Sequence, residues 1–221
     1  MTSPDHEEAL LATALRETEP ADALTGQILD AAREQFMTFG LRRSTVDDVA
    51  KRAKVSRVTV YRRIGNKDSL VSACLLREYR RFVAEVDAAV AALPTMEDRL
   101  VEGFVAVLGH IRRHPLVGGL LKLEPEIMLP FLTLESGPAF LAMRDYLTDR
   151  LHRAQRAEGR PESDSTPVAE LMVRITVSFL LNPVSCFALD DDEQVRAFAR
   201  GYLVPLISVP GRQGAAPGAA G

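Results

Sequence analysis

The residues between Ser56 and Arg63 combine side chains whose types and spacing suit contact with DNA. Successive residues of a helix are about 100° apart, so Val60 and Ile64 fall on one side of this segment, where they can anchor it to a core. Val58 falls on the opposite side together with a threonine, a tyrosine and several arginines. An outward face of this composition suits the major groove, where base edges offer both methyl groups and hydrogen-bond acceptors.

The outward side chains divide into base-reading and phosphate-binding groups. Val58 and the methyl group of Thr59 can contact a thymine methyl group, and Arg57 can donate to O6 and N7 of a guanine. Tyrosine and arginine side chains can also donate to phosphate oxygens, which orients a protein on the duplex without reading its sequence. The full set of predicted DNA-binding residues is Arg43, Ser44, Thr45, Ser56, Arg57, Val58, Thr59, Tyr61, Arg62, Arg63 and Lys67.

Two short helices with a tight turn between them must position these side chains. Thr45 is followed three residues later by Asp48, which is the pattern of a capping box at a helix start. Residues 54–55 form the turn, and Ser56 can cap the second helix. Two amphipathic helices joined in this way form a helix-turn-helix. The free N–H groups in the first turns after Thr45 and after Asn66 offer a further route to phosphate.

The sequence also predicts helix for almost all of the remaining chain. A helix ending at Gly40 precedes the motif, and a long helix capped by Asn66 follows it and must end before Pro94. No strand alternation or internal repeat is present, so the sequence predicts an all-α protein. We expect an N-terminal tail over 1–20, a helix-turn-helix DNA-binding domain of three helices over 21–67, a larger helical ligand-binding and dimerisation domain over 68–208, and a disordered tail over 209–221.

The charge distribution favours a nucleic-acid partner. Residues 33–81 contain 13 Lys and Arg against 5 Asp and Glu, although the whole chain has a net charge of −3. A basic block inside an acidic protein is typical of a phosphate-binding module. No apolar stretch approaches the length of a membrane-spanning helix, and the N-terminus lacks the pattern of a secretory signal, so we expect a cytoplasmic protein. Its two cysteines, Cys74 and Cys186, are expected to be buried free thiols.

Other classes of protein explain the sequence less well. His110 and His114 share a helix face, but Ile111 stands where a zinc metalloprotease helix carries glutamate, so the pair reads as polar surface. We predict no catalytic residue, metal site or cofactor, because no nucleophile triad or glycine-rich phosphate loop is present. One alternative is a DNA-binding protein without sequence preference, which would share the basic block but would not require an outward valine, threonine and tyrosine. Another is a structural helix pair whose basic face is solvated and does not bind DNA.

The segment from Thr45 to Leu70 resembles the DNA-binding domain of the TetR family of one-component transcriptional regulators. The matching positions are Thr45, Val49-Ala50, Val55-Ser56, Thr59-Val60-Tyr61, Lys67 and Leu70. Three positions differ from the family pattern: Lys54 replaces the usual turn glycine, Arg63 a frequent histidine, and Ile64 the usual phenylalanine. The motif covers about fifty residues, and chain length and the later helices extend the resemblance loosely.

The resemblance implies a homodimer that binds a near-palindromic operator through two recognition helices, with repression as the commonest behaviour. Pairing would involve helices near 136–157 and 166–188, and the candidate interface residues are Phe140, Leu147, Leu151, Leu171 and Ile175. It also implies an effector cavity, with candidate lining residues Phe104, Leu108, Met128, Phe131, Met143 and Phe179. Because that lining is apolar, we expect a small apolar effector. Both sets of apolar residues also fit an ordinary monomer core.

Overall fold

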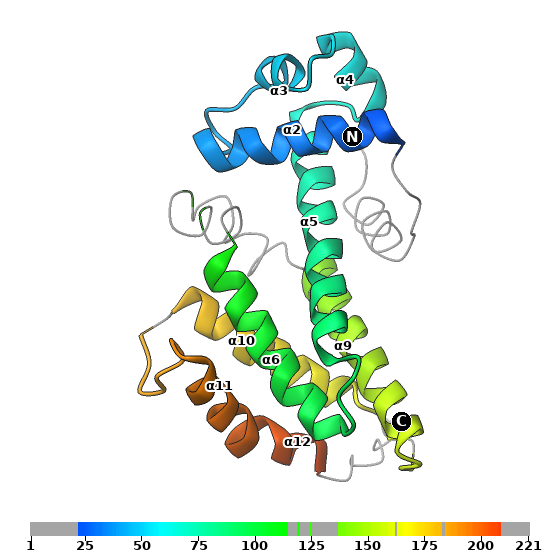
Figure 1. Ribbon diagram of the computed structural model, residues 1–221, viewed down its shortest axis with the longest axis vertical. Helices are drawn as coiled ribbons and strands as arrows, with labels where there is room; N and C mark the ends of the chain where they lie inside the picture. The colour runs from blue at the N-terminus through cyan, green and yellow to red at the C-terminus, as the bar shows by residue number, and fades with distance from the viewer. Residues whose placement is uncertain are drawn as a thin grey trace, which may run out of the picture. The chain divides into compact units, whose positions relative to one another are not determined.

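The protein is described by a computed structural model that covers residues 22–114, 119, 124, 137–161, 163–182 and 184–208. Every regular element in these residues is helical, which confirms the all-α prediction (Figure 1). In chain order they are α2 (Ala23–Phe39), α3 (Val46–Arg52), α4 (Arg57–Arg63), α5 (Lys67–Val90), α6 (Met96–Arg113), α9 (Gly137–Ala157), α10 (Thr166–Leu181), α11 (Asp192–Phe198), the π-helix η1 (Ala199–Leu203) and α12 (Val204–Ser208).

The chain divides into two compact units. The first comprises Met1–Val86 with Gly109–Ala139, and the second comprises Asp87–Leu108 with Phe140–Gly221. The first unit therefore contains the helix-turn-helix and most of α5, while the second contains most of α6 and the later helices. Among the described residues, no helix combines the length and apolarity that a membrane span requires.

The core of the first unit holds the short helices in place. The helix α3 packs against both α2 and α4. The largest fully buried side chains here include Ile28 from α2, Val49 from α3, Val60 from α4 and Leu70 from α5. A helix of seven residues is marginal by itself, so α3 and α4 depend on this shared burial.

Local capping sets where these helices begin. The Thr45 hydroxyl accepts a hydrogen bond from the backbone N–H of Asp48, and the Asp48 carboxylate accepts one from that of Thr45, which completes the predicted capping box. The Asn66 side chain accepts from the N–H of Ser69 at 2.9 Å, so the predicted cap of α5 is confirmed. The helix α5 ends at Val90, before the proline that the sequence marked as its limit.

The end of α2 shows a close approach that requires glycine. Gly40 has φ +79°, a conformation that side chains with Cβ rarely adopt. A Cβ there would also lie 2.5 Å from the carboxylate of Glu124. That carboxylate accepts hydrogen bonds from the backbone N–H groups of Leu41 at 2.7 Å and Arg42 at 3.2 Å. The turn before α3 is thus held by a residue more than eighty positions later in the chain.

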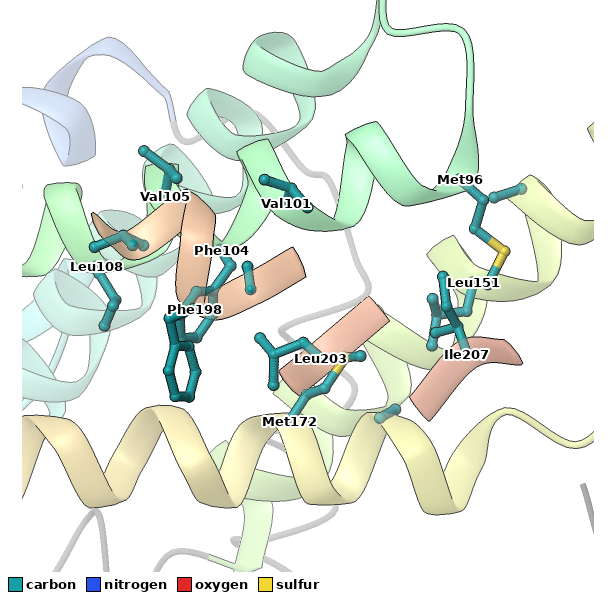
Figure 2. Close-up of a cluster of buried hydrophobic side chains, with 14 residues drawn as sticks. Met96, Val101, Phe104, Val105, Leu108, Leu151, Met172, Phe198, Leu203 and Ile207 are labelled. Carbon is teal, nitrogen blue, oxygen red and sulfur yellow. The ribbon is translucent and has the colours of Figure 1, made fainter. Parts of the chain in front are cut away.

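The second unit has its own apolar core, to which α6, α9, α10, α11, η1 and α12 all contribute (Figure 2). Its aromatic centre is the ring of Phe198, whose neighbours by centroid distance are Phe187 at 4.9 Å, Tyr202 at 5.1 Å, Phe179 at 5.3 Å and Phe104 at 5.8 Å. The helix expected near 166–188 begins at Thr166, with Pro167 in its first turn, and ends at Leu181. The helix α11 begins at Asp192, where the side chain of Asp191 caps it by accepting from the backbone N–H of Gln194.

The two cysteines differ from one another. Cys74 is buried in the first unit, as predicted, and burial raises the pKa of its thiol to about 12. Cys186 is exposed, so the prediction that both thiols are buried was wrong for this one. It lies in the connection between α10 and α11 rather than on the inner face of a helix.

Candidate nucleic-acid interface

The helix α4 presents one face to the core and the other to solvent, as the helical wheel predicts. Val60 is 0% exposed, and Val55 and Ile64 pack against the same core. On the other side, Val58 is 73% exposed and Tyr61 is 43% exposed. Both exposed side chains thus lie on the face that the helical wheel places away from the core.

The start of α4 is fixed by Ser56. Its hydroxyl accepts a hydrogen bond from the backbone N–H of Thr59 at 3.0 Å, and the two hydroxyl oxygens are 2.8 Å apart. This cap satisfies an N–H group that the first turn of a helix otherwise leaves without a partner. Both hydroxyls are therefore engaged locally, and the methyl group of Thr59 remains the group suited to an apolar contact.

Arg57 lies between two neighbours on the exposed face. Its Nε is 3.2 Å from Oδ1 of Asp47 on α3, and its guanidinium carbon lies 5.3 Å from the centre of the Tyr61 ring. Hydrogen bonding to Tyr61 and the negative charge of Asp47 both raise the pKa of Arg57. The guanidinium thus has an acidic and an aromatic neighbour on the exposed face.

The other predicted contact residues surround this centre. Arg62 and Arg63 are exposed, and Arg63 forms an ion pair with Asp22, the N-cap of α2. Lys67 is half-buried, and its Nζ donates to the Arg42 carbonyl at 3.3 Å. At the opening of the motif, the exposed Arg43 and Thr45 side chains bond the Phe39 carbonyl and the Asp48 carboxylate respectively.

Ser44 does not share this exposed position. It is fully buried, and its hydroxyl donates to the Gly40 carbonyl at 2.6 Å. The hydroxyl helps to close the turn that follows α2, so it does not form part of the exposed face. We therefore remove Ser44 from the candidate contact set.

The turn between α3 and α4 departs from ordinary backbone geometry at one residue. Lys54 has φ +54°, and it is the only residue other than glycine with positive φ in the described part of the chain. This is the position where the family pattern has glycine. The lysine accepts the left-handed conformation that the tight turn needs, and its side chain is exposed.

Two acidic residues near the motif were missed by sequence reasoning. Asp47 reaches Arg57 across the turn, but nothing in its type or spacing separates it from the helix-capping carboxylate of Asp48. Glu124 bonds the backbone before α3 from far along the chain. Only a three-dimensional structure reveals a contact of such sequence separation.

The histidine pair at the end of α6, with His110 in the helix and His114 directly after it, contacts carboxylates and is not open surface. His110 Nδ1 is 2.8 Å from a Glu85 carboxylate oxygen, and His114 Nε2 is 3.2 Å from one of Glu78. Both imidazoles are largely buried, so the interpretation of these residues as polar surface was wrong. No group of three or more side chains suited to holding a metal ion occurs within the residues described.

The candidate effector-lining residues lie in or against the core of the second unit. Phe104 and Leu108 are buried there, and Phe179 packs against them from α10. Met143 is half-buried on α9. Met128 and Phe131 lie outside the described residues.

The candidate dimer residues divide into two kinds. Leu151 is buried in the core of the second unit, and Leu147 and Ile175 pack against that core. Leu171 on α10 is 48% exposed, and Phe140 is half-buried beneath the guanidinium of Arg174. The exposed set on α9 and α10 thus does not include Leu151, whose side chain already has its partners within one chain.

Comparison with known proteins identifies the architecture. Residues 28–74 match the family model for bacterial regulatory proteins of the tetR family, and residues 96–200 match the model for the tetracyclin repressor C-terminal domain. The uncharacterized HTH-type transcriptional regulator Rv2250c of Mycobacterium tuberculosis is 29% identical over 153 residues, covering 69% of this chain and 78% of that protein. The HTH-type transcriptional regulator AlkX of the same organism is 26% identical over 163 residues, covering 72% and 76% respectively.

A solved structure shows the same fold. The TetR family repressor AlkX from Dietzia sp. superposes with a TM-score of 0.61 at 24% sequence identity, covering 85% of this chain and 97% of that chain. The two family models together span both the helix-turn-helix and the later helices. The chain belongs to the TetR family of helix-turn-helix transcriptional regulators.

Proposed function

We propose that this protein is a ligand-responsive repressor that binds a palindromic DNA operator as a homodimer. The observation that carries the proposal is the exposed face of α4, where Val58 and Tyr61 stand out from a helix anchored by the buried Val60. The composition of this face favours contact with the major groove over exposure to solvent, because it combines apolar groups with charged donors. In this reading residues 21–67 bind DNA, and residues 68–208 dimerise and bind the effector.

The proposed contacts follow from where each side chain lies. Val58 and the Thr59 methyl group meet thymine methyl groups, and Arg57 bonds a guanine. Donors around this centre bind phosphate and fix the orientation of α4. The phosphate-binding set comprises the side chains of Arg43, Tyr61, Arg62, Arg63 and Lys67, together with Thr45 and Ser56 at the starts of α3 and α4, whose hydroxyls are engaged within the motif.

Selection of bound sequences from random DNA tests the proposal most directly. A regulator of this kind should enrich one palindromic sequence and prefer it over random DNA by about 10³-fold or more. Little preference would instead indicate a general DNA-binding protein. Salt dependence does not separate the two, because both kinds of binding release counterions from phosphate.

Substitutions on the exposed face test the assigned contacts. Tyr61→Ala and Lys67→Ala should each weaken operator binding about tenfold, the effect of losing one favourable contact of roughly 1.4 kcal/mol. Tyr202→Ala is a matched control, since this exposed tyrosine lies on η1 in the second unit. Urea unfolding of each variant separates lost binding from lost folding. Wild-type affinity in both test variants would reject the docking face.

Dimerisation is proposed through the exposed apolar residues of α9 and α10, chiefly Leu141 and Leu171. Two recognition helices in one dimer would be spaced by roughly 34 Å, one turn of DNA, which is why the operator should be palindromic. Leu171→Glu should yield a monomer by analytical ultracentrifugation and lose operator binding. A dimer that persists in this variant would place the interface elsewhere.

The effector is proposed to be a small apolar molecule, because the candidate lining residues are apolar. It would act by binding more tightly to a dimer geometry that does not span two grooves. Addition of such a ligand should release the selected operator in a binding assay. A reporter gene behind that operator should be silent with the protein and active when the ligand is added; activation without ligand would show an activator instead.

A further inference from the structure

A carboxylate lies on the face that we propose meets the negatively charged DNA. Asp47 is on α3, and its side chain is 51% exposed beside an Arg57 side chain that is 62% exposed. A free carboxylate at this place would repel phosphate and lower the affinity for any DNA sequence. Asp47 is not free, however, because it forms an ion pair with Arg57. This pair connects α3 to α4 across the turn of the motif.

The geometry of the pair leaves Arg57 able to read a base. The nitrogen nearest Asp47 is Nε, at 3.2 Å, so the ion pair does not require the two terminal nitrogens. The guanidinium carbon also lies 5.3 Å from the centre of the Tyr61 ring. Arginine loses substantial rotamer freedom when it is fixed, and two neighbours from different helices already restrict it here before DNA arrives.

We propose that Asp47 is a specificity-determining positioning residue, which holds Arg57 by Nε so that its terminal nitrogens face a guanine in the major groove. The inference rests on the proposed DNA-binding function and assigns to α3 a part in base selection. If Arg57 binds a phosphate in place of a base, its guanidinium loses the ion pair with Asp47. Asp47 therefore disfavours the phosphate-bound position of Arg57. Asp47 therefore weakens binding to random DNA while it strengthens discrimination at one base pair.

Two other roles for Asp47 predict different behaviour. As an acidic residue in the first turn of α3, it can interact favourably with the helix dipole. In that case its removal would change stability and would not change the base preference. As a direct reader, it can accept a hydrogen bond from a cytosine amino group; in that case its removal would change preference whether or not Arg57 is present. Only the positioning role makes its effect on preference depend on Arg57.

The test compares four full-length proteins: wild type, Asp47→Asn, Arg57→Ala and the double variant. Each is used to select sequences from random DNA, and its affinity is then measured for the preferred site, for that site with the guanine changed, and for random DNA. Arg57→Ala should remove the preference at one base pair, by about tenfold or more. Asp47→Asn should reduce the preference at that same base pair by about threefold to tenfold and tighten random-DNA binding by about twofold to threefold.

The double variant should select the same sequences as Arg57→Ala alone, because Asp47 has no arginine left to position. Asp68→Asn is the matched charge control, since it removes an exposed acid from the first turn of α5. It should leave the preference at the Arg57 base pair unchanged. Urea unfolding of all five proteins shows that each remains folded.

The outcomes separate failure of this inference from failure of the proposed function. A wild-type protein that selects no sequence overturns both. A selected operator whose profile does not change with Asp47→Asn, or changes equally with and without Arg57, overturns the positioning role and leaves the regulator proposal standing. An unchanged profile in Arg57→Ala overturns the inference as well, because there is then no reading arginine to position.

Discussion

Two carboxylates in the first unit, Asp47 and Glu78, both form ion pairs with arginine, but their surroundings are opposite. Asp47 lies in solvent on α3 with one arginine beside it. Glu78 on α5 is only 4% exposed and lies among three cationic or polar partners: Arg33 Nε at 2.7 Å, an Arg81 nitrogen at 3.0 Å and His114 Nε2 at 3.2 Å. Those partners come from α2, α5 and the residue that follows α6.

The difference shows that burial decides how much an ion pair contributes to the stability of the fold. A buried carboxylate has lost its water, so removing its partners or its charge leaves unpaired groups that solvent reaches poorly. An exposed pair contributes little to stability because water competes for both groups. It can therefore be altered with little cost to folding. The Glu78 cluster connects three elements, whereas the Asp47 pair leaves the Arg57 side chain largely exposed.

The largest expected effect is on the buried cluster. Glu78→Gln should lower the free energy of unfolding by about 3 kcal/mol, the lower end of the range for breaking a buried ion pair, because Arg33 and Arg81 retain some access to water. Urea unfolding measures it. Asp30→Asn is the matched control, as its exposed carboxylate pairs with Arg77 and Arg81. That change should lower stability by under about 1 kcal/mol, and equal effects would erase the contrast between buried and exposed pairs.

The histidine of this cluster should make stability depend on pH. Burial lowers the pKa of His114 below 6.5, His110 and Arg33 lower it further, and Glu78 opposes them. As the pH falls, the unfolded chain binds this proton before the folded chain does. The stability present above pH 6.5 should therefore decrease as the pH falls through the folded pKa.

The measurement compares wild type with His114→Asn by urea unfolding at about pH 7.5 and about pH 5.5. Other groups titrate in both proteins, so the informative quantity is the difference between them. Wild type should lose more stability than the variant on acidification. Parallel losses would show that His114 is not the group responsible.

The sequence predicted the parts of the molecule that depend on neighbours along the chain. The outward face of α4 follows from the spacing of Val60 and Ile64, and the caps at Thr45 and Asn66 involve partners three residues away. Helix periodicity and capping are local properties. For that reason the helices and the exposed face of the motif could be predicted without knowledge of tertiary contacts.

The sequence did not predict what depends on distant residues. Ser44 is polar and precedes the capping threonine, yet it is fully buried, although its own hydrogen bond is to Gly40 only four residues earlier. Leu151 has the spacing of an interface residue, but the same apolar stripe also serves the core of its own chain. The burial of Glu78 depends on α2 and α6 arriving beside α5, which no periodicity encodes.

A smaller effect is expected in the turn beside the exposed pair. Lys54→Gly should raise the free energy of unfolding by about 0.5–1 kcal/mol, because glycine adopts positive φ without the steric cost of a Cβ and part of that gain is offset by chain entropy. Lys51→Gly removes the same charge from within α3 and should lower stability by about 1 kcal/mol. Stability that moves in the same direction in both variants would exclude backbone strain at Lys54.

The smallest expected effect on folding belongs to Asp47, and it completes the contrast with Glu78. In Asp47→Asn the urea unfolding midpoint should match that of wild type within measurement error, because both partners of the pair are largely in water. The same variant is expected to change DNA selection, so function and stability should separate at this residue. A loss of stability as large as that of Glu78→Gln would mean that Asp47 holds α3 and α4 together. Any change in DNA selection would then follow from a loosened motif, and the exposed pair would no longer differ in kind from the buried one.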